Sequence, residues 1–91
     1  MNEETLETIE QCGLVALPVD ETCAIAQMTE REFAASKQAK ERYRIGRLRG
    51  KFELRQTIRK AATSGDAQAI KTLAEYFETA DASEFVSGLN L

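Results

Sequence analysis

The chain has no histidine, one proline, two cysteines and no long apolar run, and each scarcity excludes a class of protein. Without histidine, Cys12 and Cys23 alone are too few ligands for a zinc site, so we expect no metal or cofactor. The longest apolar stretch, residues 14–19, is too short to cross a bilayer. The acidic N-terminus lacks the positive region of a signal peptide. We therefore expect a cytoplasmic protein, away from membranes, whose two cysteines are buried and reduced.

Catalytic side chains are also scarce. Histidine is absent, and neither Ser36 nor Ser64 has an obvious base nearby in the sequence. Gly46 and Gly50 lack the strand-then-helix setting of a phosphate-binding loop. We therefore expect a protein that is not an enzyme.

The composition favours helices. Only five of the 91 residues are glycine, runs of β-branched residues are rare, and good helix formers are abundant. A chain of this length suits one domain. We predict an all-α fold, a single four- or five-helix domain over residues 1–91.

Charge is distributed unevenly along the chain. Residues 1–30 carry seven acidic and no basic residues, whereas residues 31–60 carry eleven basic and three acidic residues. Residues 61–91 carry five acidic residues and one basic residue, so the overall charge of −3 conceals a strongly basic middle. Such asymmetry indicates either a polyanionic partner or charge pairing within the protein.

Apolar spacing and capping residues predict the first helices. A helix is expected over residues 3–12, with Gly13 as its stop, followed by a buried linker rather than a strand over residues 14–19. Asp20 is a candidate N-cap for a helix over residues 21–27. Thr29 and Glu32 form a capping-box pattern, which predicts that another helix begins there.

A long basic helix is then expected over residues 39–63, after a break near residues 36–39. Gly46 and Gly50 lie inside it, and its apolar stripe rotates midway, which indicates a kink or a close helix crossing. Its apolar positions are Tyr43, Ile45, Leu48, Phe52, Leu54, Ile58, Ala61 and Ala62.

Gly65 and Asp66 predict a helix end followed by a new start. They make a helical hairpin with a final helix over residues 67–78, in which Ile70 and Phe77 share one apolar stripe. Residues 79–91 are weakly patterned and are expected to form a weakly structured tail.

Residues 19–36 fit a helix-turn-helix. Two capped helices are separated by a short turn, and the small Cys23 stands ten residues before the apolar Phe33, as crossing helices require. Ala26 and Met28 occupy the other positions expected to be buried. Gln27 stands where the turn usually has glycine.

Together with later motifs, this region resembles the helix-turn-helix domains of phage terminase small subunits and related DNA-packaging proteins. The segment Tyr43-Arg44-Ile45-Gly46 and the junction Ala62-Thr63-Ser64-Gly65-Asp66-Ala67 carry the rest of the resemblance, which covers about residues 5–78. The resemblance implies DNA recognition, a large terminase subunit or other phage protein as partner, and self-association. It implies no catalysis, because in that family the ATPase and nuclease belong to the large subunit.

Basic side chains on helices can neutralise DNA phosphates. Four of them, Arg44, Arg47, Lys51 and Arg55, recur on one stripe of the long helix. Two more, Arg31 and Lys37, are assigned to the second helix of the helix-turn-helix, which is the recognition helix. We predict that all six contact duplex DNA. The alternative is a non-catalytic interaction or assembly module whose basic middle pairs with acidic surfaces and binds no nucleic acid. Charge complementarity and the Gly46/Gly50 pair also indicate a homo-oligomer, with head-to-tail contacts that close into rings where the rotation permits.

Overall fold

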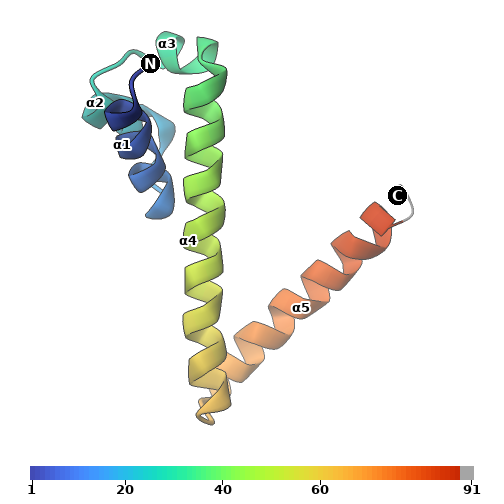
Figure 1. Ribbon diagram of the computed structural model, residues 1–91. Coiled ribbons are helices and arrows are strands. Elements are labelled where there is room, and N and C mark those ends of the chain that lie inside the picture. Colours follow the sequence, from blue (N-terminus) through green and yellow to red (C-terminus); the bar gives the residue numbers. More distant parts are fainter. Residues whose placement is uncertain (89–91) are drawn as a thin grey trace. The chain divides into compact units, whose positions relative to one another are not determined.

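The computed structural model describes residues 1–88, which form α-helices and no strand. The all-α prediction is confirmed. The helices, coloured along the chain in Figure 1, are α1 (Glu3–Leu14), α2 (Val19–Ala26), α3 (Glu30–Ala35), α4 (Lys37–Thr63) and α5 (Ala67–Gly88). Where the sequence suggests one domain, the chain divides into two compact units, Met1–Glu53 and Leu54–Leu91, with the boundary inside α4. Each unit is described by itself.

Each helix of the first unit contributes one residue to a common core. Ile9 of α1, Cys23 of α2, Phe33 of α3 and Ala39 of α4 are buried against one another. The ring of Tyr43 meets Phe33 edge-on, with centroids 5.9 Å apart. The expected burial of Cys23 and Phe33, the pair that defines the helix-turn-helix pattern, is confirmed, and Ala26 and Met28 pack against the same core.

Both cysteines are buried free thiols, as predicted. Burial raises the pKa of the Cys23 thiol, and the nearby carboxylates Glu30 and Asp20 raise it further. Because the thiolate is the reactive form, Cys23 should react with a thiol reagent far more slowly in the folded protein than in denaturant at the same pH. Labelling followed by mass spectrometry checks this. Equal rates in the two conditions would contradict the burial.

The turn between α2 and α3 ends α2 with a left-handed residue. Gln27 has φ 57° and ψ 48°, the conformation that glycine favours. The amide of Gln27 donates to the Ala24 carbonyl, and the amide of Met28 donates to that of Cys23. This is the Schellman arrangement, here without its usual glycine. The turn therefore has the geometry of a glycine turn although its residue is glutamine.

Gln27→Gly should stabilise the first unit, because it removes the cost of a left-handed side chain. The expected gain is about 0.5–1 kcal/mol, somewhat reduced by the greater freedom of glycine in the unfolded chain. Chemical denaturation checks it. Ala24→Gly is the matched control: the same residue introduced inside α2 at an exposed position should cost about 1 kcal/mol. Destabilisation by both substitutions would contradict the assigned turn.

Two predicted helix boundaries were wrong. Helix α1 continues through Gly13, which is buried, and ends at Leu14; the left-handed residue that follows is Ala16, with φ 57°. Helix α2 begins at Val19 after Pro18, and Asp20 lies in its first turn instead of capping it. A carboxylate in the first turn still interacts favourably with the helix dipole.

The next two helix starts agree with the sequence. Thr29 and Glu32 form the predicted capping box at the start of α3, with both hydrogen bonds at 3.0 Å. The break expected near residues 36–39 falls at Ser36, whose hydroxyl oxygen accepts a hydrogen bond from the amide of Ala39. Ser36 is thus occupied in starting α4. No strand forms in the linker that precedes α2, as expected, but its expected burial was wrong: none of residues 15–18 is buried, and Val15 is 72% exposed.

In the second unit, α4 and α5 meet at the predicted hairpin junction. Gly65 has φ 98°, and the Asp66 carboxylate accepts from the amide of Ala69, 2.9 Å away. The expected end of the last helix at residue 78 was wrong, because α5 continues to Gly88. Neither glycine nor proline occurs between Ala67 and Gly88 to stop it. Residues 89–91 of the predicted tail lie outside the described residues.

Several apolar side chains expected to pack are exposed. In the first unit, Leu48 and Phe52 of α4 are 50% and 63% exposed. In the second unit, Leu54 is 57% exposed, Ile70 50% and Phe77 61%. The spacing of apolar residues therefore predicted the helices correctly, but it overestimated how many of these apolar side chains are buried within one chain.

Candidate nucleic-acid interface

One face of α4 crosses α1 at very close range. A Cβ on Gly46 would overlap the carbonyl oxygen of Glu10, and a Cβ on Gly50 would overlap that of Leu14. From the other side, a Cβ on Gly13 would overlap the carbonyl oxygen of Tyr43. The close crossing expected from the two α4 glycines therefore exists, and it lies within one chain, which leaves that glycine pair no free surface for a dimer.

Arginines on the same face of α4 pair with the acidic residues of α1. Arg42 lies 2.9 Å from a Glu3 oxygen and 3.0 Å from a Glu10 oxygen, and Arg49 reaches the other oxygen of Glu10. The hydrogen bond from Arg42 lowers the pKa of the Glu3 carboxyl, and the pKa of Arg42 is raised in return. Part of the charge asymmetry in the sequence is thus neutralised internally.

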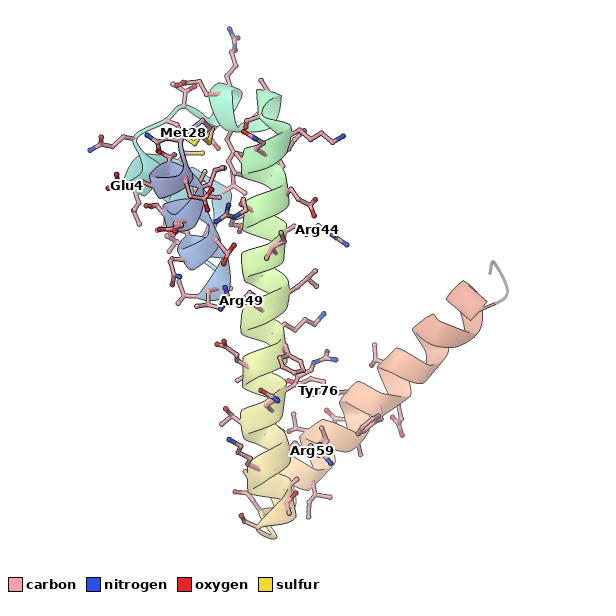
Figure 2. The ribbon with its side chains drawn as sticks, viewed as in Figure 1. Glu4, Met28, Arg44, Arg49, Arg59 and Tyr76 are labelled. Atoms are coloured by element: carbon pink, nitrogen blue, oxygen red, sulfur yellow. The ribbon has the colours of Figure 1, made fainter. Side chains whose placement is uncertain are left out.

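The opposite face of α4 carries cations that α1 does not reach. Figure 2 shows Arg49 on the side that faces α1 and Arg44 on the other side. Exposed basic residues recur here every three or four positions, so that they form one stripe along the helix. We call this stripe, within the first unit, the outer basic face of α4: Lys37, Lys40, Arg44, Arg47 and Lys51.

The outer basic face is only weakly paired. Arg44 lies 3.7 Å from Glu41, one turn away, with both side chains exposed. The guanidinium of Arg47 lies 5.9 Å from the centre of the Tyr43 ring. Among the described residues, no ion pair involves Lys37, Arg47 or Lys51. A weakly paired stripe of cations is a surface that can neutralise phosphates.

The structure brings together four of the six residues predicted to contact DNA, and adds one. Lys37, Arg44, Arg47 and Lys51 share the outer basic face. The expected place of Lys37 on the recognition helix was wrong, because α3 ends at Ala35 and Lys37 is the first residue of α4. Lys40 belongs there as well; sequence reasoning missed it, although it lies three residues after Lys37 and four before Arg44. That spacing was the available signal.

The other two predicted residues are not part of the outer basic face as defined here. Arg31 is exposed on α3, a helix of six residues that ends just before Ser36. Arg55 belongs to the second unit, where its guanidinium lies 4.2 Å from the centre of the Tyr76 ring. Arg55 thus makes a cation–π contact within its own unit.

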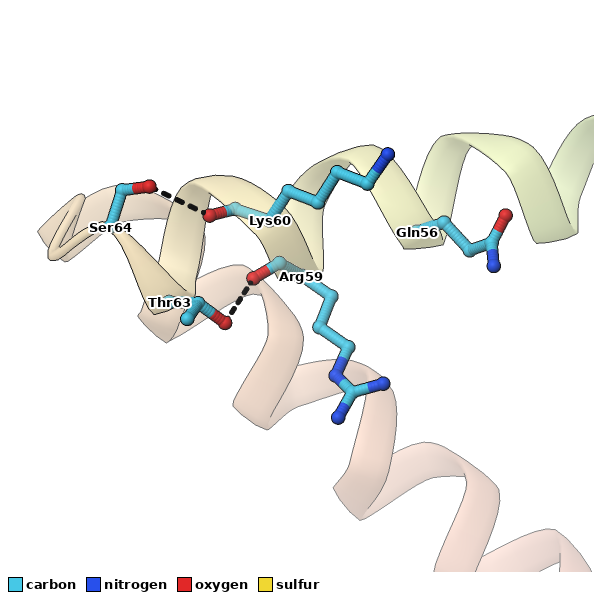
Figure 3. A pocket seen from close by; sticks show the side chains of 5 residues that line it. All are labelled: Gln56, Arg59, Lys60, Thr63 and Ser64. Carbon is cyan, nitrogen blue, oxygen red and sulfur yellow. Dashed lines mark hydrogen bonds between the residues drawn. The ribbon is translucent and has the colours of Figure 1, made fainter.

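A second group of cations lies near the hairpin junction of the second unit. Gln56, Arg59, Lys60, Thr63 and Ser64 line an open hollow of about 400 Å³. The hydroxyls of Thr63 and Ser64 donate to the carbonyl oxygens of Arg59 and Lys60, and Figure 3 shows the two cationic side chains extending in different directions. The hollow therefore has two cations that do not converge on one point.

The described residues contain no group of three or more cysteine or acidic side chains arranged to hold a metal ion. Over the same residues, none of the helices has the length and apolar character needed to cross a membrane. Comparison of the chain with known protein families, with curated proteins and with solved structures finds no match.

Proposed function

We propose that the first unit binds duplex DNA as a helix-turn-helix protein of the terminase-small-subunit type, without catalytic activity. One observation carries the proposal: the acidic helix α1 pairs with Arg42 and Arg49 and leaves the outer basic face of α4 to solvent. If α1 covered the outer basic face, the cations of that face would be neutralised by acidic residues of the same protein. The exposed face is instead available to phosphates.

Binding of this kind relies mainly on phosphate contacts. Helix α3 carries a single cation, Arg31, beside Glu30 and Glu32, and the Glu32 carboxylate is engaged in the capping box. Few groups on α3 can therefore read base edges, whereas the outer basic face offers five cations to the backbone. The large terminase subunit, or another phage protein, is the partner that would supply catalysis.

A titration of duplex DNA at several salt concentrations tests the proposal. Each phosphate contact releases counterions, so five contacts predict a log–log slope of affinity against salt of about −4 to −5. Absence of binding near about 50 mM salt, where non-specific binding is strongest, would overturn it. The protein would then be an interaction module whose basic face meets acidic protein surfaces.

A further inference from the structure

An open groove is lined by residues of α1, of the linker that follows it and of α2, and none of the α1 residues at the glycine crossing with α4 belongs to its lining. It has a volume of about 400 Å³. Its lining includes two exposed apolar side chains, Val15 and Ile25, 72% and 57% exposed, together with the exposed carboxylates Glu4 and Glu7. In Figure 2, Glu4 points away from α4. The groove therefore combines exposed apolar side chains with negative charge.

The outer basic face of α4 has the complementary pattern. Leu48 and Phe52 are large exposed apolar side chains, four residues apart on one side of the helix. They alternate with cations at i, i+3, i+4, i+7 and i+8, which places all five on one helical face: Arg44, Arg47, Leu48, Lys51 and Phe52. A basic amphipathic helix of this kind suits an apolar groove with an acidic edge.

The two surfaces belong to the same unit but cannot meet within one chain. Helix α1 contacts α4 through the glycine crossing and through Arg42 and Arg49, on the face opposite to Leu48 and Lys51. We infer that the groove between α1 and α2 receives the face of α4 that carries Leu48 and Phe52 from a second copy of the chain.

This contact is head-to-tail, since it joins two different surfaces. Repeated, it produces a ring or an open filament rather than a closed twofold dimer. It also hides Arg44 and Lys51 from other anions. If the proposed DNA binding holds, DNA and a neighbouring subunit therefore compete for one face of α4.

Charge reversal on each surface tests the contact without DNA. One full-length variant carries Glu4→Lys and Glu7→Lys in the groove, and the other carries Arg44→Glu and Lys51→Glu on α4. All four side chains are exposed, so both variants should remain folded by circular dichroism. Sedimentation velocity at low salt then compares the wild type, each variant alone and their equimolar mixture.

Wild-type protein should self-associate at low salt, and each variant alone should sediment as a smaller species because like charges meet. In the mixture, the positive groove of one variant meets the negative α4 face of the other. The unchanged groove and the unchanged α4 face also meet with opposite charges. The weight-average mass should then rise by about twofold or more over either variant alone. Two outcomes would overturn the inference: a monomeric wild type at high concentration and low salt, or variants that assemble separately as well as the wild type does. A wild-type protein that assembles in this way but binds no DNA would refute the proposed function alone.

Discussion

Replacing Gly46 with alanine should destabilise the first unit by about 2–3 kcal/mol, although alanine is the better helix former. Propensity alone favours the substitution by about 1 kcal/mol. The added Cβ overlaps the carbonyl oxygen of Glu10, however, and a backbone atom inside a helix cannot step aside as a flexible side chain can. Helix α1 must therefore shift as a whole, which loosens the contact of Ile9 with the core and the ion pair between Glu10 and Arg42.

Thermal unfolding followed by circular dichroism measures the effect. For a domain of this size, the expected loss lowers the midpoint by about 10 °C or more. Gln38→Ala is the matched control, because Gln38 is exposed on the same helix and its replacement should change stability by no more than about 0.5 kcal/mol. A Gly46→Ala protein as stable as the wild type, or more stable, would mean that α1 and α4 do not cross at the glycines.

The glycines also illustrate how far the sequence predicts this fold. Two glycines inside a long helix indicate a kink or a crossing, because each costs helix stability that something must offset. Their sequence position does not identify the partner, which is the segment around Glu10 and Leu14. For the same reason Gly13 was misread as a helix stop, since a glycine that admits a neighbouring backbone and one that ends a helix look alike in sequence.

The candidate interface was predictable in part. Helical spacing correctly placed Arg44, Arg47 and Lys51 together, because a single helix determines their relative positions. The internal pairing of Arg42 and Arg49 depends on how α1 lies against α4, a contact more than thirty residues apart in sequence. The ring contact of Arg55 with Tyr76 is likewise a tertiary contact within the second unit. Composition thus gives the total charge of the middle segment, and packing decides which cations remain available.

Removing two of these available cations gives the sharpest test of DNA binding. In a protein with Arg47→Ala and Lys51→Ala, the log–log slope of DNA affinity against salt should flatten by about two units, from near −4.5 to near −2.7. The affinity loss should be largest at low salt, where counterion release contributes most. Both residues are exposed, and the loss of the contact between Arg47 and the Tyr43 ring should cost no more than about 1 kcal/mol of stability.

The matched control is a second double variant, Arg59→Ala with Lys60→Ala. It removes the same charge from the same helix, but its two side chains belong to the second unit and extend in different directions. If binding depends on the outer basic face, this control should keep a slope close to that of the wild type. If both variants flatten the slope equally, DNA responds only to total charge, and the assignment of the interface to Lys37, Lys40, Arg44, Arg47 and Lys51 is wrong. The variant with Arg47→Ala and Lys51→Ala could instead keep the full slope while remaining folded. The phosphates would then contact another surface, and the outer basic face of the first unit would not be the DNA-binding surface.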